Sequence, residues 1–217
     1  MSMNKAIVIG GSRGIGKAIS ESLSSIGYDV ISTSKKELDT SNLSSVKNFV
    51  QTHNKIDVLV LNTGGPPAKE FFSVTEEEWI KYHNQLFLGF CMVLQKIKIN
   101  NGGYVFVISS SVIKEPNPKL VISSAYRSAF TSVFKILSKS FAEKNISFIN
   151  IAPGLINTDR TKEVIDNLEE YQKSLPMKRL GEPKEIGDFV KSIVENKIKY
   201  LSGVVINFDG AASSFVY

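Results

Sequence analysis

The segment from Lys5 to Leu23, KAIVIGGSRGIGKAISESL, constrains the fold of this chain more than any other. It begins with an apolar run, passes through a glycine-rich loop and ends in a stretch whose apolar residues recur at helical spacing. Glycine lets a backbone turn tightly and approach a ligand, and the first N–H groups of a helix attract negative charge. A strand, a glycine loop and a helix N-terminus therefore predict a cradle for the phosphates of a nucleotide cofactor.

The glycine spacing, Gly10-x-x-x-Gly14-x-Gly16, differs from the G-x-G-x-x-G fingerprint, although it can act by the same mechanics. Glycine-rich turns between a strand and a helix also occur as plain structure. The strand before this loop and the helix after it favour the cofactor interpretation. The loop residues that we expect at the cofactor are Gly10, Ser12, Arg13, Gly14, Ile15 and Gly16.

Composition limits the classes of protein to which the chain can belong. With 217 residues, 42% of them hydrophobic, residues 1–217 are expected to form a single domain with one sizeable core. A single cysteine and the absence of a His/Cys cluster predict a cytoplasmic protein without a metal site. No apolar stretch approaches the roughly 20 residues of a membrane span. The net charge of +5 is spread along the chain, which indicates a surface that attracts an anionic cofactor and no nucleic-acid site.

Apolar, strand-like runs alternate with helical patterns along the whole chain. This alternation predicts an α/β fold, a single doubly wound parallel-sheet domain of the Rossmann type. The expected strands are residues 6–9, 29–33, 58–61, 104–109, 147–152 and 204–208. The expected helices are residues 14–26, 43–52, 75–97, 123–144, 161–174 and 183–195.

Small or polar residues follow three of the expected strands. They are Asn62-Thr63-Gly64-Gly65, Ser109-Ser110-Ser111 and Pro153-Gly154. Ligands of such sheets bind beyond the carboxyl ends of the strands. Each group alone is compatible with an ordinary turn, and together they predict the rim of one site.

These landmarks, in this order, resemble the short-chain dehydrogenase/reductase family, and within it the members similar to 3-oxoacyl-acyl-carrier-protein reductase. Residues 10–16 match the family pattern TGxxxGxG, with Ile9 at the Thr position, and residues 61–64 correspond to its NNAG motif. Residues 153–158 match the PGxxxT segment. The C-terminal signature of the family is matched by residues 179–186, 201–203 and 209–210. The resemblance spans nearly the whole chain. It implies a nicotinamide cofactor and hydride transfer between that cofactor and a small-molecule carbonyl or alcohol.

The same resemblance bears on the choice of cofactor. NAD-specific sites carry an acidic residue at the end of the second strand, and here that position holds Ser34, followed by Lys35. Arg13 lies where NADP-dependent members carry a basic residue. The missing acid and the positive charge on two sides favour NADPH over NADH. The resemblance also implies contacts from Asp39 and Thr40 to adenine, from Asn62 and Gly64 to ribose, and from Ile156 and Thr158 to the nicotinamide carboxamide, with Pro153 and Gly154 in the same segment.

The catalytic set of the family is only partly present. In the family a Tyr donates the proton, a Lys four residues later lowers the pKa of that Tyr and holds the ribose, a Ser polarises the carbonyl and an Asn supports a proton relay. Ser110 stands at the Ser position, and thirteen residues further the Tyr position holds Ser123. Arg127 replaces the Lys and Leu86 the Asn. Tyr126 is one residue away from the Lys position, a rotation of about 100° on a helix.

Three interpretations follow from these departures. In the first, which we favour, the protein is a divergent reductase in which Ser110 polarises the carbonyl and Tyr126, Ser123 or water supplies the proton. Arg127 then grips the ribose or phosphate, because a guanidinium does not give up its proton. In the second, the protein is an NADPH-binding module that has lost catalysis and acts through partners. In the third, the Pro-marked loop at residues 114–118 shifts the register of the Tyr and Lys positions.

Two further expectations concern the surface. The helices expected at residues 79–97 and 123–141 are apolar on more than one face, and the resemblance implies a homodimer or homotetramer that packs through them. Residues 161–175 are expected to form a lid over the substrate.

Overall fold

A six-stranded parallel sheet forms the centre of the protein, which was analysed as a computed structural model that describes residues 3–53, 55–165 and 167–216. The strand order is β2-β1-β3-β4-β5-β6, and every neighbouring pair is parallel. The strands are β1 (Lys5–Val8), β2 (Asp29–Ser32), β3 (Lys55–Leu61), β4 (Lys98–Ile108), β5 (Ser147–Pro153) and β6 (Val204–Phe208). The doubly wound α/β fold expected from the sequence is thus confirmed.

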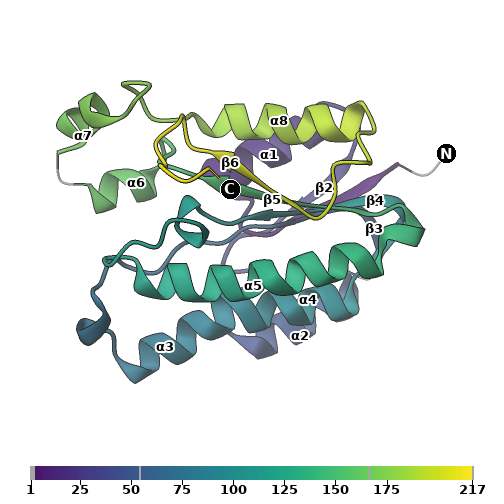
Figure 1. Cartoon of the computed structure of the whole chain (residues 1–217). Coiled ribbons are helices and arrows are strands. Elements are labelled where there is room, and N and C mark those ends of the chain that lie inside the picture. The colour runs from purple at the N-terminus through teal and green to yellow at the C-terminus, as the bar shows by residue number, and fades with distance from the viewer. Residues whose placement is uncertain (1–2, 54, 166, 217) are drawn as a thin grey trace.

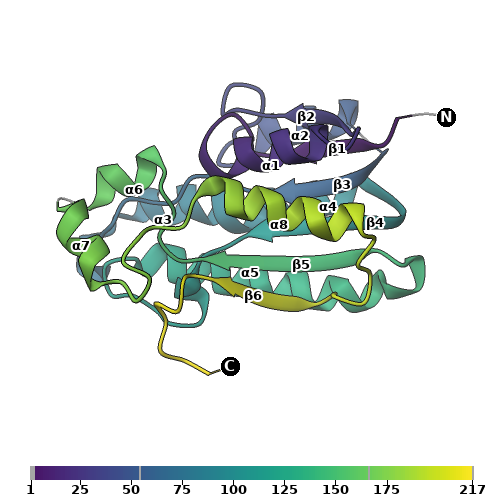
Figure 2. The ribbon, with the colours of Figure 1, turned by 90° about the horizontal axis from the view of Figure 1, so that it is seen from above.

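Helices cover both faces of the sheet (Figure 1). They are α1 (Gly14–Ser24), α2 (Leu43–Thr52), α3 (Glu76–His83), α4 (Gly89–Lys96), α5 (Val121–Ser140), α6 (Asp159–Val164), α7 (Leu168–Ser174) and α8 (Pro183–Glu195). The helices α1 and α8 pack on one face, and α2, α4 and α5 on the other. The short helices α6 and α7 lie beyond one end of the sheet (Figure 2).

The apolar core is divided by the sheet into two layers. On the α5 side, Phe90, Phe130 and Phe134 are fully buried against strand residues such as Leu59 and Val105. On the other side, the apolar faces of α1 and α8 meet the opposite face of the same strands, through Ile19, Leu23, Ile186 and Val190. Because helices cover both faces, the central strands are apolar at almost every position.

Two of the expected helices differ in the structure. The helix expected at residues 75–97 is interrupted by a π-helical turn at Asn84–Leu88, and a Cβ on Gly89, just after this turn, would lie 2.6 Å from the carbonyl oxygen of Thr40. The helix expected at 161–174 consists of α6 and α7, because the Asn167 side chain accepts a hydrogen bond from the Glu170 N–H and starts a second helix. Asp166, within the expected lid, lies outside the described residues.

The carboxyl ends of the parallel strands meet at one edge of the sheet. The loops after β1, β2, β3, β4 and β5 gather there, so that segments far apart in the sequence line a common groove. Among the helices that the structure describes, none is long and apolar enough to cross a membrane.

Candidate active site

The loop between β1 and α1 has a backbone that requires glycine. Gly10 and Gly14 have φ angles of +63° and +53°, in the left-handed region that glycine adopts without strain. Gly16 has ordinary backbone angles, but there is no room for a side chain at this position. A Cβ there would lie 2.1 Å from the Gly10 carbonyl oxygen and 2.8 Å from Asn62 Nδ2. The Asn62 side chain already donates to that carbonyl at 3.0 Å. The loop is therefore folded tightly against the end of β3.

The N-terminus of α1 is open to a ligand. Its N-cap residue, Arg13, makes no capping hydrogen bond, and the first turn holds no acidic residue. By contrast, α3 and α8 each begin with a capping box, and the Asn42 side chain caps α2. The first N–H groups of a helix need acceptors, and an anion is the acceptor that the helix dipole favours. The structure thus fits the predicted phosphate cradle.

Three pockets follow one another along this edge of the sheet, with volumes of about 210, 250 and 280 Å³. Asn62, Thr63 and Gly65, from the loop after β3, line all three. The pockets therefore form one continuous groove. We refer to the pocket beside β2 as the outer half, to the pocket beside β4 and β5 as the inner half, and to the pocket at the start of α1 as the middle.

The outer half contains the residues expected around the adenosine. Ser34, Lys35, Asp39 and Thr40 line it together with Arg13. Lys35 and Asp39 form an ion pair at 3.3 Å, and hydrogen bonds from the Ser41 hydroxyl and amide outweigh burial and hold the pKa of Asp39 below its usual value. Thr40 is 3% exposed, and its hydroxyl has no hydrogen-bond partner among the described residues. An unsatisfied buried hydroxyl at the edge of a pocket fits a polar ligand such as an adenine ring.

The end of β2 differs from the expectation that no carboxylate stands there. The Glu37 carboxylate accepts hydrogen bonds from the Ser34 N–H, at 2.8 Å, and from the Ser34 hydroxyl. These hydrogen bonds lower the pKa of Glu37. Counting along the sequence does not reveal this carboxylate, because Glu37 lies three residues after Ser34 and only a turn brings its side chain back to Ser34. The positive charge of Arg13 and Lys35 is therefore opposed by Asp39 and Glu37.

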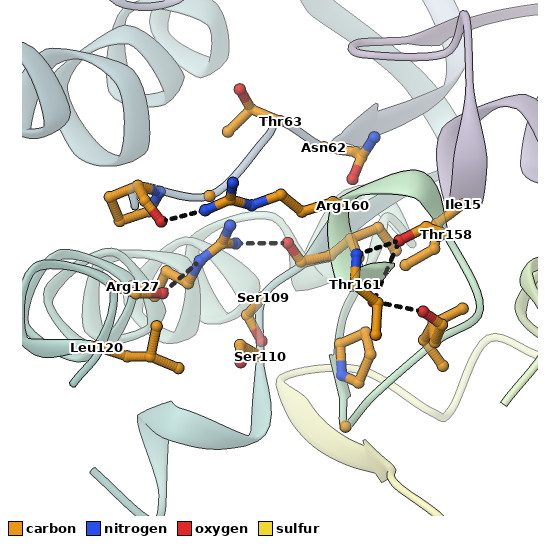
Figure 3. Close-up of a pocket in the computed structure, with 17 residues that line it drawn as sticks. Ile15, Asn62, Thr63, Ser109, Ser110, Leu120, Arg127, Thr158, Arg160 and Thr161 are labelled. Carbon is orange, nitrogen blue, oxygen red and sulfur yellow. Dashed lines mark hydrogen bonds between the residues drawn. The ribbon is translucent and has the colours of Figure 1, made fainter. Parts of the chain in front are cut away.

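The inner half is a cavity of about 210 Å³ at the ends of β4 and β5 (Figure 3). Its lining includes the predicted residues Ile15, Asn62, Ser110, Ser123, Arg127, Pro153, Gly154, Ile156 and Thr158. The Ser110 hydroxyl oxygen accepts a hydrogen bond from the Val112 N–H at 3.4 Å, and its proton has no acceptor among the described residues. Ser110 can therefore donate to an oxygen of a bound ligand.

A chain of buried and partly buried hydrogen bonds fixes the walls of this cavity. The Ser109 hydroxyl donates to the side-chain oxygen of Asn150, and the Asn150 amide donates to the Thr131 hydroxyl at 3.0 Å. Thr131 in turn donates to the carbonyl oxygen of Arg127 at 2.8 Å. These contacts tie β4 and β5 to the helix that carries Ser123 and Arg127. Ser109 is thus occupied, which leaves the neighbouring Ser110 as the free hydroxyl.

Ser123 and Arg127 face the inner cavity from adjacent turns of α5. Arg127 donates through Nε to the Ser123 hydroxyl at 3.2 Å and through Nη1 to the Ile108 carbonyl oxygen at 2.9 Å. It is 9% exposed, and burial lowers its pKa to about 10, so that it stays positively charged at neutral pH. The register that places Ser123 and Arg127 at the Tyr and Lys positions therefore agrees with the residues that line the cavity.

Tyr126 points elsewhere, and its expected role as proton donor is not supported. Its ring packs edge-on against Trp79 at 5.7 Å and His83 at 5.5 Å between ring centroids, on the side of α5 that meets α3. The one-residue offset from Arg127 turns the Tyr126 side chain by about 100° around the helix. Leu86, at the Asn position, is 1% exposed in the same apolar cluster and brings no polar group to the site.

Arg160 and Thr161 also line the inner cavity, although the sequence argument did not name them. Arg160 Nη2 donates to the Pro66 carbonyl oxygen at 2.8 Å. The Thr161 hydroxyl donates to the Ile156 carbonyl oxygen at 2.6 Å. The signal available in the sequence was their position two and three residues after Thr158, the last residue named in that segment. In the outer half, Gln85 was missed as well, and it donates to the Gly64 carbonyl oxygen at 2.6 Å.

Comparison with known proteins identifies the family. A family model described as enoyl-(acyl carrier protein) reductase matches residues 37–212. The 3-oxoacyl-[acyl-carrier-protein] reductase of Chlamydia muridarum is 30% identical over 244 aligned positions, which cover 96% of this chain and 97% of that protein. The corresponding reductase of Chlamydia trachomatis is 29% identical and covers 94% of this chain and 95% of its own length.

Solved structures share the fold. A short chain dehydrogenase from Burkholderia cenocepacia in complex with NADP has a TM-score of 0.87 at 21% identity, covering 96% of this chain and 97% of that chain. A 3-oxoacyl-[acyl-carrier protein] reductase from Brucella melitensis in complex with NAD has a TM-score of 0.89 at 21% identity, covering 98% of each.

The fold, the groove and the sequence matches define an oxidoreductase of the kind that uses a nicotinamide cofactor. The chain belongs to the short-chain dehydrogenase/reductase family, and within it resembles the 3-oxoacyl-acyl-carrier-protein reductases.

Proposed function

We propose that the protein transfers hydride between NADP(H) and a small carbonyl or alcohol substrate bound in the inner cavity. The observation that carries this proposal is the continuous groove, which joins the open N-terminus of α1 to a cavity with a free serine hydroxyl and a buried cation. A bound nicotinamide supplies or accepts the hydride. Residues of this chain bind the substrate, polarise its carbonyl group and supply the proton.

The proposal assigns roles to several residues of the inner cavity. Ser110 donates a hydrogen bond to the carbonyl oxygen and polarises it. Arg127 supplies positive charge where negative charge develops on that oxygen. Because Tyr126 points away, the proton comes from Ser123 or from water that enters beside it. Thr158 lies at the wall shared with the middle of the groove, where the nicotinamide end of the cofactor is proposed to bind, and Ile156 lines the inner cavity.

The preference for NADPH is also part of the proposal. Arg13, Lys35 and Lys81 line the outer half of the groove, and two carboxylates oppose them, Asp39, which is paired with Lys35, and Glu37, which is bonded to Ser34. A 2′-phosphate would therefore meet an excess of positive charge. We expect binding of NADPH, followed by its fluorescence, to be at least about 10-fold tighter than that of NADH, which is the effect of a single charge-assisted contact. Equal affinity would overturn the preference.

Turnover is tested by following NADPH oxidation against a panel of carbonyl compounds. We expect Ser110→Ala to lower kcat by about 100- to 1,000-fold, the cost of removing one aligned donor to a developing oxyanion. Tyr126→Phe is the control on the same helix, and we expect it to keep kcat within about two-fold, because its ring packs against Trp79 and His83 and does not line the cavity. NADPH binding without turnover of any carbonyl would contradict the proposed activity and favour a binding module.

A further inference from the structure

A turn directly after β2 brings the carboxylate of Glu37 back onto Ser34. The Ser34 N–H donates to Glu37 Oε2 at 2.8 Å, and the Ser34 hydroxyl donates to the same oxygen. The Lys36 N–H donates to the Ser34 hydroxyl oxygen at 3.1 Å, and the Leu38 N–H donates to the Ser34 carbonyl oxygen at 3.0 Å. Both hydrogen-bond donors of Ser34 are therefore used by one carboxylate of the chain itself.

Ser34 lies at the point where the second strand of the sheet meets the outer half of the groove. In dinucleotide-binding folds of this kind, the group at the end of the second strand lies beside the 2′ position of the adenosine ribose. Ser34 lines the outer half of the groove together with Arg13 and Lys35. An N–H group and a hydroxyl between two cations are donors suited to a phosphate. In the structure, the Glu37 carboxylate occupies these donors.

The Glu37 side chain is charged and can leave this position without disturbing the core. The hydrogen bonds from the Ser34 hydroxyl and then from the Ser34 N–H lower the pKa of Glu37, so that it is ionised at neutral pH. Glu37 is exposed, and in the described part of the chain no cation forms an ion pair with it. A phosphate that binds to Ser34 must therefore displace a negative charge, but it need not move any buried group.

We propose that Glu37 is an intramolecular competitor of the cofactor's 2′-phosphate, and that it thereby limits how strongly the protein distinguishes NADPH from NADH. This inference rests on the proposed cofactor and adds a residue that regulates its selection. NADPH binds when its 2′-phosphate displaces the Glu37 carboxylate from the two donors of Ser34. NADH carries a hydroxyl in place of this phosphate and leaves the contact between Glu37 and Ser34 intact. Glu37 thus weakens the binding of NADPH selectively.

The test removes the charge of Glu37 and compares the two cofactors. Fluorescence titration measures the affinities for NADPH and NADH in the wild-type protein and in Glu37→Gln. We expect Glu37→Gln to bind NADPH about 5- to 10-fold more tightly, the effect of a hydrogen bond to a charged group near the surface, and to bind NADH within about two-fold of the wild type. Glu37→Ala should act in the same direction. Glu143→Gln removes an exposed carboxylate just after α5, outside the groove, and should change neither affinity.

A second measurement separates this inference from the proposed function. Calorimetry records the binding of adenosine 2′,5′-bisphosphate and of adenosine 5′-monophosphate, which differ in the 2′-phosphate and contain no nicotinamide. A gain in Glu37→Gln that is confined to the bisphosphate supports the inference even if the wild-type protein binds NADPH and NADH equally or reduces no carbonyl. The proposed preference or turnover then fails alone.

Four results would overturn the inference. Unchanged affinities of Glu37→Gln for NADPH and the bisphosphate would show that Glu37 does not compete. A loss of NADH affinity in this variant would show that Glu37 instead binds the ribose hydroxyls. An equal gain in Glu143→Gln would show an effect of net charge alone. The absence of bisphosphate binding in every variant would show that the outer half of the groove holds no 2′-phosphate.

Discussion

At the scale of single residues, the inner cavity combines free hydrogen-bond donors with an unpaired charge. Ser110 keeps a free proton because the chain from Ser109 through Asn150 to Thr131 satisfies its neighbour. Arg127 keeps free N–H groups because, within the described part of the chain, it donates to the Ser123 hydroxyl and the Ile108 carbonyl oxygen through Nε and Nη1 alone. Both residues therefore have hydrogen-bond donors that a ligand can use.

The unpaired charge leads to a prediction about stability. Arg127→Met replaces a buried cation by an apolar side chain of similar length, and replacing buried charges by apolar groups is often neutral or stabilising. We expect the melting temperature of the ligand-free protein to rise by about 2–4 °C, equivalent to roughly 1 kcal/mol for a chain of this size. Differential scanning calorimetry of both proteins checks this, and a marked fall in melting temperature would show that Arg127 contributes to the core.

The sequence predicted these residues unequally. Ser110 could be located because it follows the end of a strand, and Ser123 and Arg127 because the family resemblance fixes their spacing from Ser110. Tyr126 was ambiguous, because one helical step separates a cavity residue from a core residue and counting does not show which face is covered. Glu37 could not be found by counting, because its contact with Ser34 depends on a turn that brings the side chain back.

At the scale of elements, the helices begin in different ways. Side chains cap α2, α3 and α8, whereas α1, which follows the glycine loop, begins without a side-chain cap and with no acidic residue in its first turn. A Cβ at position 16 would collide with the Gly10 carbonyl oxygen, which is backbone and cannot move aside.

We therefore predict that Gly16→Ala lowers the affinity for NADPH by more than about 10-fold, because the loop must shift away from its binding geometry. Fluorescence titration measures this affinity. Gly27→Ala is the control, since it has a φ of +85° but open space around its Cβ and lies away from the groove. It should destabilise the protein by about 1–2 kcal/mol and leave cofactor affinity unchanged. An unaltered affinity in Gly16→Ala would show that the loop does not contact the cofactor.

The start of α8 leads to a prediction on pH. Arg179 contacts both carboxylate oxygens of Glu185 at 2.8 Å, and the Glu182 N–H donates to the same carboxylate at 2.7 Å. The hydrogen bond from Arg179, first, and then that from Glu182 lower the pKa of Glu185 from 4.5 to about 2. A carboxyl whose pKa is lower in the folded state stabilises the fold above its unfolded pKa and loses that contribution as the pH falls.

We expect the wild-type protein to lose urea stability relative to Glu185→Gln as the pH is lowered from 5 toward 2, while the difference between the two is constant above pH 5. Urea unfolding curves at several pH values measure it. A difference that does not change with pH would mean that the ion pair, exposed to solvent, contributes nothing measurable.

The sequence predicted element types better than element boundaries. All six strands and the helices at residues 43–52 and 183–195 were expected from the alternation of apolar runs and helical patterns. The π-helical turn at Asn84–Leu88 was not, because periodicity does not distinguish one extra residue in a helical turn.

At the scale of the whole molecule, we propose that the protein forms a homodimer or homotetramer through α4 and α5. Ile136 on α5 is 64% exposed, and Cys91 and Met92 on α4 are only partly buried. Association would cover this apolar surface. Size-exclusion chromatography with light scattering should give a mass of at least twice 24.0 kDa, and a monomer at micromolar concentration would contradict the proposal.

The groove also has a thermodynamic consequence for the molecule as a whole. Its walls come from residues 9–15, 34–40, 62–66, 81–85, 108–127 and 153–161, so that it exists only when five of the six strands are in place. A ligand of the groove therefore binds the fully assembled sheet and not a partly folded chain. Its binding energy is added to the stability of the entire fold, about 2.7 kcal/mol at a free concentration 100 times Kd. In a cell with ample cofactor, the resistance of this protein to unfolding and proteolysis would thus follow the supply of its cofactor.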